Sequence, residues 1–139
     1  MSQNPIPQGN YRPAVRYGNL IYTAGMTPRR NGVLMMSGKV TPDRPLEDYR
    51  EAVIQAASNA LTAAQNTLKE GEKLVQVLSL YVFVNASPDF TAHPKVGDIA
   101  SNWLCEQLGE AGVGPRVTVG MGTLPGDAPV EIQLVAAAE

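Results

Sequence analysis

The 139-residue chain has 44% hydrophobic and 17% charged residues, which predicts one globular domain over residues 1–139 with its own hydrophobic core. Its formal net charge of −2 gives no electrostatic support for a nucleic-acid partner. The single cysteine, Cys105, excludes an intrachain disulfide and a cysteine-based metal cluster.

The first third of the chain predicts a polar N-terminal segment and two short strands. Residues 1–9 are rich in proline and polar side chains and do not resemble a signal peptide. No apolar run is long enough to cross a bilayer. We therefore expect a cytoplasmic protein without a membrane partner. Leu20–Ala24 has the composition of a strand. Residues Pro28–Gly32 are typical of a turn, and a short strand over Val33–Met36 follows.

A long amphipathic helix is the strongest local signal. Hydrophobic residues recur at helical spacing, Pro45 suits the first turn, and Gly71 suits the C-terminal end. The residues on this predicted inner face are Leu46, Tyr49, Val53, Ala56, Ala60, Ala64 and Leu68.

The middle of the chain predicts a central strand and a second helix. Residues Leu74–Val84 are nearly continuous in hydrophobic side chains, which is typical of a strand buried on both faces. One face would contact the helices, and another subunit is a candidate for the other. Pro94–Leu108 has helical spacing, with an inner face formed by Ile99, Ala100, Trp103, Leu104 and Leu108.

The last third predicts a β-hairpin. Strands over Arg116–Thr123 and Val130–Ala137 flank the turn-forming segment Leu124–Pro129, which contains Pro and Gly-Asp. The resulting order β-β-α-β-α-β-β predicts an α+β fold with two helices on one face of a largely antiparallel sheet.

The hairpin register predicts one core face and one small polar face. With Leu124 opposite Pro129, the core face combines hydrophobic residues of both strands. The core face comprises Val117, Val119, Met121, Val130, Ile132 and Leu134, and the polar face comprises Arg116, Thr118, Gly120, Gly122, Glu131, Gln133 and Val135. A strand glycine often marks the close approach of a ligand or of another backbone.

Arg116 and Glu131 are the chemically distinctive pair of this hairpin. A guanidinium binds a carboxylate through two parallel hydrogen bonds, and a glutamate can act as a base or orient water. In the predicted register they lie six residues apart, roughly 20 Å along the strand. If both serve one site, we expect them to come from different subunits.

Taken singly, these residues also have ordinary interpretations. An arginine at a strand start and a strand glutamate are commonly solvated or ion-paired surface groups. Tyr11, in a coil-like stretch, could be a packing residue. His93, just before Pro94, is typical of a helix entry.

Four blocks of sequence carry a recognisable pattern: Gly18–Gly25, Tyr81–Asn85 leading to Asp89-Phe90, Gly114–Val117, and Leu124-Pro125 followed by Pro129–Ile132. From about Tyr11 to Ala137, the chain resembles the RidA/YjgF family of reactive-intermediate deaminases, in a less-studied subgroup. The resemblance implies a chorismate-mutase-like fold and a homotrimer with sites in clefts between subunits.

The resemblance also implies an activity and roles for residues. The activity is hydrolysis of 2-imino acids, such as 2-iminobutanoate and 2-iminopropanoate, to 2-oxo acids and ammonia without a metal or organic cofactor. Arg116 would bind the substrate carboxylate, and Glu131 would position the attacking water. Tyr11 would line the pocket, and Gly25 would offer its backbone N–H to the carboxylate.

Four positions differ from the common family pattern. Ala24 stands where the family often has serine, Met26 where it has glutamine, and Thr118 where it has cysteine. Asp98 is the nearest match to an asparagine of the second helix. We expect Ala24, Thr118 and Asp98 to line the substrate pocket and to alter its substrate range.

Two other functions follow from the same resemblance. The changed lining is compatible with a non-catalytic or regulatory protein that binds small carboxylates. An endoribonuclease or translation-inhibitor role is the third possibility, and the lack of a basic patch argues against it.

Overall fold

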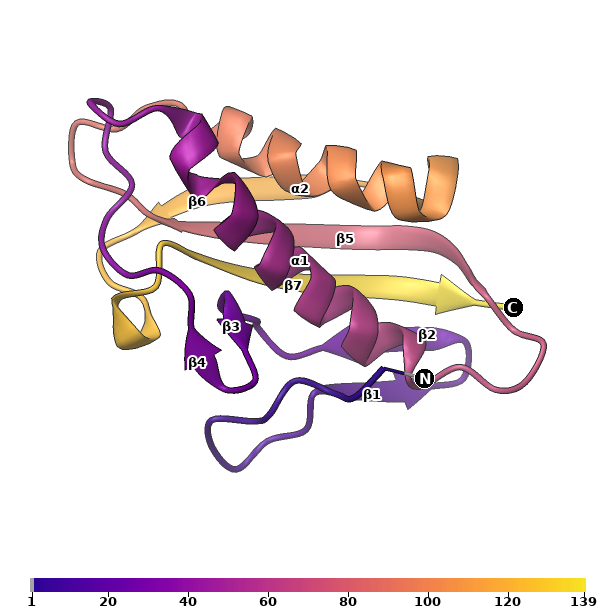
Figure 1. Cartoon of the computed structure of the whole chain (residues 1–139). Coiled ribbons are helices and arrows are strands. Elements are labelled where there is room, and N and C mark those ends of the chain that lie inside the picture. The colour runs from indigo at the N-terminus through magenta and orange to yellow at the C-terminus, as the bar shows by residue number, and fades with distance from the viewer. Residues whose placement is uncertain (1) are drawn as a thin grey trace.

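The computed structural model describes residues 2–139 and contains a five-stranded mixed sheet in the order β1-β2-β7-β5-β6. All neighbouring strands are antiparallel except β5 and β6, which are parallel. Helices α1 and α2 pack side by side on one face (Figure 1). The predicted α+β class with two helices on one face is therefore confirmed. The strands are β1 Ala14–Tyr17, β2 Leu20–Thr23, β5 Leu74–Asn85, β6 Arg116–Met121 and β7 Val130–Ala138.

The helices follow the predicted hydrophobic spacing. A 3-10 turn over Leu46–Tyr49 leads into α1 (Arg50–Gln65), and α2 covers His93–Leu108. The inner face of α1 is buried at Val53, Ala56, Ala60 and Ala64. Helix α1 ends at Gln65 rather than near Gly71. Small alanine side chains let this helix lie close to the sheet.

A small hairpin beside the sheet differs from the prediction. β3 (Arg29–Arg30) pairs with β4 (Val33–Leu34), and the two residues between them, Asn31 and Gly32, have φ angles of 54° and 82°. Two consecutive positive φ angles match a type I′ turn, which Asn-Gly favours. The predicted turn over Pro28–Gly32 is therefore wrong at its start, where two arginines form a strand. Strand β1 was also missed.

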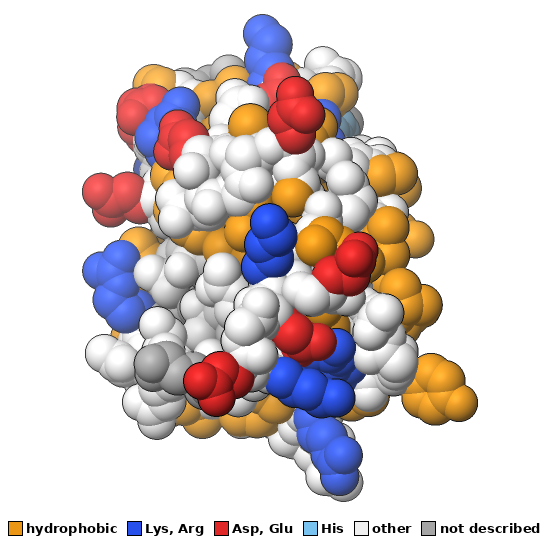
Figure 2. All heavy atoms as spheres, turned by 90° about the vertical axis from the view of Figure 1, so that its right-hand side faces the viewer, with side chains coloured by type: hydrophobic (Ala, Val, Ile, Leu, Met, Phe, Trp, Pro, Cys, Tyr) orange, Lys and Arg blue, Asp and Glu red, His pale blue; other side chains and the backbone are white. Residues whose placement is uncertain are grey.

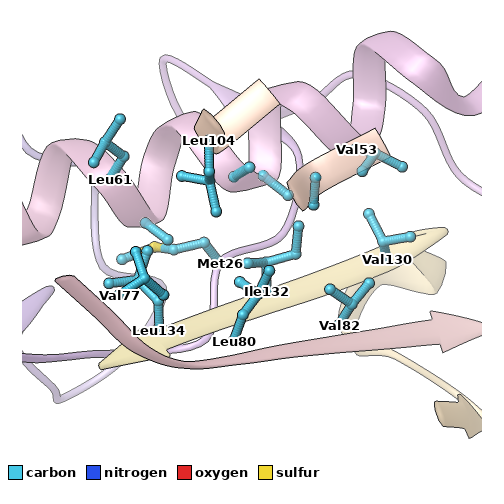
Figure 3. Packing of buried hydrophobic residues seen from close by; sticks show 14 of the residues in the cluster. Met26, Val53, Leu61, Val77, Leu80, Val82, Leu104, Val130, Ile132 and Leu134 are labelled. Atoms are coloured by element: carbon cyan, nitrogen blue, oxygen red, sulfur yellow. The ribbon is translucent and has the colours of Figure 1, made fainter. Parts of the chain in front are cut away.

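The hydrophobic core lies between the sheet and the two helices (Figure 3). Alternate residues of β5 and β7 supply its lower layer, and α1 and α2 supply its upper layer. Met26 joins them from the loop after β2. Fully buried members include Val53, Val77, Val82, Leu104, Val130, Ile132 and Leu134.

The predicted C-terminal hairpin is wrong. Strand β7 pairs with β2 and β5, and β5 separates it from β6. The segment Leu124–Pro129 therefore carries the chain past the end of β5 and includes a short 3-10 turn at Pro125–Asp127. Strand β5 pairs with both β6 and β7. It therefore lies between these two strands, although they are consecutive in the sequence.

This topology reverses the predicted faces of β6. Thr118 and Ile132 both lie opposite Val82, so Thr118 faces the helices. Val117 and Val119, predicted to be core, are instead 43% and 37% exposed on the other face of the sheet. Arg116 and Glu131 therefore do not share a face.

The helix-free face of the sheet is rich in exposed hydrophobic side chains. In Figure 2 this face lies at the right-hand side of the view and carries a column of hydrophobic groups. Its large exposed residues are Val15, Tyr17, Leu20, Tyr22, Tyr81, Val117 and Val119. Exposed apolar patches of this kind are typical of protein–protein contact surfaces.

An ion pair fastens the edge strand β1 to the loop after α1. Arg16 donates from Nη1 and Nη2 to the two carboxylate oxygens of Glu72, at 2.6 and 2.8 Å. This pairing, with the Lys69 backbone N–H, lowers the pKa of Glu72 to about 2.

Glu72→Gln is expected to destabilise the protein at neutral pH. Because the folded-state pKa of Glu72 is lowered, its stabilising effect is present above the ordinary glutamate pKa and is lost as pH falls towards about 2. Urea unfolding across this pH range should show a difference from wild type that shrinks in acid. The exposed Glu70→Gln is the matched control, and a pH-independent difference would contradict the prediction.

Candidate active site

Four of the predicted site residues lie together in one cleft. The cleft has a volume of about 380 Å³, a size typical of small-molecule sites. Tyr11, Ala24, Gly25 and Glu131 line it. Gln8, Thr27, Arg29 and Pro125, which were not predicted, complete the lining.

Glu131 lies directly over Gly25. The neighbouring Met26 is paired with Ile132 of β7 through backbone hydrogen bonds of 2.7 and 2.9 Å. This pairing holds the loop after β2 against β7. A Cβ atom at Gly25 would collide with the Glu131 carboxylate. Only glycine at this position leaves the space that the carboxylate occupies.

The Glu131 carboxylate has no hydrogen-bond or ion-pair partner within residues 2–139. Partial burial raises the pKa of Glu131 above its ordinary value. A carboxylate that is desolvated, unpaired and open to a cleft is suited to accept a proton from a bound water. This side of the cleft therefore presents a group that is chemically able to act as a general base.

Tyr11 and Gly25 present polar groups to the same cleft. The Tyr11 hydroxyl accepts a hydrogen bond from the Gln8 backbone N–H at 2.9 Å, and the side chain is 45% exposed. No hydrogen bond engages the Gly25 N–H within the described chain, so this donor is available to a ligand.

Arg116 lies elsewhere, between β6 and α2. Its Nη1 donates to Asp98 Oδ1 at 2.9 Å and to Ser101 Oγ at 3.0 Å, and its Nη2 donates to the Pro94 carbonyl at 3.2 Å. Asp98 is one of the residues expected to line the substrate pocket, whereas its contact with Arg116 and the role of Ser101 were not predicted. The ion pair with Asp98 balances the charge of Arg116 and holds its guanidinium at the edge of the sheet.

Thr118 adjoins Arg116 under the same helix. Its buried Oγ1 has no hydrogen-bond partner in residues 2–139. A Cβ atom at Gly97 of α2 would come within 2.5 Å of Thr118 Oγ1 and 2.8 Å of Arg116 Nε. Two residues further along β6, His93 lies against Gly120. Gly120 thus marks the close approach of the His93 side chain to β6.

The two groups of predicted residues do not meet within one chain. Arg116 lies opposite Leu80, and Glu131 opposite Phe83, on the two sides of β5. The three-residue offset separates Arg116 and Glu131 by roughly 10 Å along the strands, rather than by the predicted 20 Å. The two strand spacings between β6 and β7 add roughly 10 Å across the sheet. The odd offset also puts the two side chains on opposite faces. A site that uses both needs a second subunit, which stays a prediction.

Arg29 is the main cleft residue that sequence analysis missed. The Asn31-Gly32 pair was the available signal, because it predicts a two-residue hairpin turn with strands on both sides. Side chains alternate along a strand, so Arg29 and Arg30 diverge: Arg29 lines the cleft, while Arg30 donates to Gln55 on α1.

The family model described as Endoribonuclease L-PSP matches residues 1–138 of the chain. The chain belongs to this family, also known as RidA/YjgF. The recognition made from the sequence blocks is therefore confirmed.

Relatives agree with this membership. A 2-iminobutanoate/2-iminopropanoate deaminase of Dermatophagoides farinae is 28% identical, and the match covers 97% of this chain and 91% of that protein. A crystal structure of an Agrobacterium tumefaciens protein of unknown function is 34% identical with a TM-score of 0.84, covering 96% and 86% of the two chains. The E. coli YjgF gene product, 23% identical with a TM-score of 0.66 over 96% and 92%, shares the fold.

Proposed function

We propose that this protein hydrolyses 2-imino acids and related enamines to 2-oxo acids and ammonia, in clefts between the subunits of a homotrimer. The unpaired Glu131 carboxylate, seated over Gly25 in a cleft with Tyr11, is the observation that carries the proposal. The deaminase activity named for the mite relative supports it. A cytoplasmic location is proposed with it.

The reaction needs one water and no change of oxidation state. Glu131 accepts a proton from the water as the oxygen bonds to the imine carbon, and the C=N π electrons move to nitrogen. The nitrogen takes up this proton from Glu131 and then the remaining proton of the new hydroxyl group. The C–N bond breaks as ammonia leaves, and the C=O bond of the 2-oxo acid forms. Orientation and a placed base supply much of the acceleration, because an iminium carbon is already electrophilic.

In this proposal, Arg116 of a neighbouring subunit binds the substrate carboxylate. Within one chain Arg116 is on the opposite face of the sheet from Glu131, so a second copy is required. The exposed hydrophobic column on the helix-free face supports assembly, because burial of apolar area favours association. The Gly25 N–H would be a second donor to the carboxylate.

An assay of ammonia release tests the proposal, with 2-imino acids generated in place from amino acids by an amino-acid oxidase. The wild type should accelerate release, and Arg116→Ala should lose roughly 10- to 100-fold because a charge-assisted carboxylate contact is removed. Equal rates for the two proteins would refute the assigned role of Arg116. Light scattering would report whether the protein is a trimer.

A non-catalytic carboxylate-binding protein is the second candidate. The changed lining favours it, because Ala24, Met26 and Thr118 stand where the family often has serine, glutamine and cysteine. Calorimetry with 2-oxo acids separates the two functions: binding that requires Arg116 without any turnover would identify a binder. An endoribonuclease role, suggested by the family's description, finds no support in a net charge of −2.

A further inference from the structure

Arg29 is a charged group in the Glu131 cleft to which the proposed reaction assigns no role. It begins β3, and its side chain lies between the β3–β4 hairpin and the connection that follows β6. Its Nη1 donates to the Gly32 carbonyl at 3.0 Å. Its Nη2 lies beside Gly126, where a Cβ atom would come within 3.2 Å. The side chain is therefore held at one wall of the cleft.

The charge of Arg29 is not balanced by an ion pair within residues 2–139. Its Nε is buried without a hydrogen-bond acceptor. Arg16, Arg44, Arg50 and Arg116 all pair with a carboxylate. A partly buried guanidinium with unused donors is costly unless an anion is supplied. The cleft thus contains a cation and an anion, Arg29 and Glu131, that do not pair with each other.

The hydrogen-bond donors of Arg29 indicate which class of ligand group would bind to it. A guanidinium presents a planar set of N–H donors that matches a carboxylate. The substrate's own 2-carboxylate is assigned to Arg116 in the proposed function, so the group beside Arg29 is a second acidic group. Thr27 and Gln8 of the same lining add polar side chains around it. The cleft volume of about 380 Å³ accommodates a small dicarboxylic acid.

We infer that Arg29 binds a second acidic group of the substrate, so that the cleft accepts 2-imino dicarboxylic acids in preference to 2-imino acids with alkyl side chains. This inference rests on the proposed function, because it takes the substrate to be a 2-imino acid. Arg29 is then a specificity-determining residue, and Glu131 acts on either class of substrate.

Calorimetry and turnover with matched acids test the inference. The binding probes are the four- and five-carbon 2-oxo dicarboxylic acids, compared with 2-oxobutanoate, and the corresponding imines are used for turnover. Wild type should bind a dicarboxylic acid at least about 10-fold more tightly than 2-oxobutanoate. Arg29→Gln should weaken that binding roughly 10- to 100-fold and leave 2-oxobutanoate unchanged.

Arg30→Gln is the control, since it removes the same charge from the adjacent exposed position and should alter neither acid. Urea unfolding of both variants would reveal a loss of the Arg29 hydrogen bond to Gly32. Equal wild-type affinities for the two classes would overturn the inference, and so would an equal weakening of both by Arg29→Gln. If alkyl imines are hydrolysed and Arg29 gives no preference for dicarboxylic imines, this inference is overturned while the proposed function stands. An absence of turnover with every imine would instead remove the proposed function.

Discussion

Glu131→Gln is expected to slow imine hydrolysis roughly 10²- to 10⁴-fold, the range that general base catalysis contributes. The substitution keeps the shape of the side chain over Gly25 but removes the group that accepts the proton of water. Initial rates of ammonia release at saturating imine would measure the loss. A variant that keeps the wild-type rate would exclude Glu131 as the base.

The pH dependence distinguishes this role from a structural one. Because burial raises the pKa of Glu131, its carboxylate takes up a proton at a higher pH than an ordinary glutamate. As pH falls, the wild-type rate should therefore decline at a higher pH than the titration of an ordinary glutamate would produce, and Glu131→Gln should lack this decline. An unpaired, partly buried charge costs stability once it ionises, so the variant should be at least as stable as wild type at neutral pH.

Mixed assemblies provide a direct test of a site shared between subunits. As pure proteins, Arg116→Ala is expected to lose roughly 10- to 100-fold in rate and Glu131→Gln roughly 10²- to 10⁴-fold. If each site takes its arginine from one subunit and its glutamate from the next, random equal mixing leaves roughly a quarter of the sites intact. Co-refolding the two variants should restore about that share of the activity. A mixture no more active than its components would contradict a site that takes Arg116 and Glu131 from different subunits.

Gly25→Ala is expected to lower turnover about 10²-fold without unfolding the protein. The added Cβ would occupy the position of the Glu131 carboxylate. That carboxylate is the end of a flexible side chain, so it moves while the backbone stays. Displacement of a catalytic group by about 1 Å commonly costs this much in rate.

Gly122→Ala is the matched control for this substitution. Gly122 has a negative φ, and a Cβ added there meets no atom within 4 Å. It should keep the wild-type rate and stability. A Gly25→Ala variant with normal turnover would show that the Glu131 carboxylate does not act from the position described above. Thermal unfolding of both variants would check that the comparison is between folded proteins.

Local pattern was sufficient for the two helices and for strand β5. Their hydrophobic patterns extend over 11 or more residues. The recurring positions of the helices include the buried ones, whereas the continuous pattern of β5 also contains Leu78 and Tyr81, which are 39% and 36% exposed. Val53 and Ala56 of the first helix and Leu104 of the second are fully buried examples. Such long patterns leave few alternative arrangements, because only one face can meet the core.

Strand pairing could not be obtained in this way. Val117, Val119 and Met121 alternate as hairpin residues would, yet their strand pairs with β5. Alternation fixes which residues share a face within one strand, but it does not identify the neighbouring strand. The separation of Arg116 from Glu131 was anticipated, but for the wrong reason: they lie on opposite faces, and not merely far apart along one.

The cleft could not be predicted from local sequence pattern, because segments that are apart in the sequence form it. Tyr11, Gly25 and Glu131 come from three distant segments, and the pairing of Met26 with Ile132 brings two of them together. The resemblance to a known family pointed to these residues where spacing alone could not. The Asn31-Gly32 turn signal predicts only that Arg29 lies on a strand, and the fold is needed to place this residue in the cleft.

The place of β7 in the sheet constrains how the chain folds as it is synthesised. This strand is the last in the sequence, yet it lies between β2 and β5 at the centre of the sheet. While residues 130–138 remain inside the ribosome, β2 and β5 have no common neighbour and the core lacks Val130, Ile132 and Leu134. The sheet therefore closes after translation of its final strand, through long-range contacts that form slowly. Until then, the emerging chain exposes the hydrophobic strand β5, and unpaired hydrophobic strands of this kind are prone to aggregation.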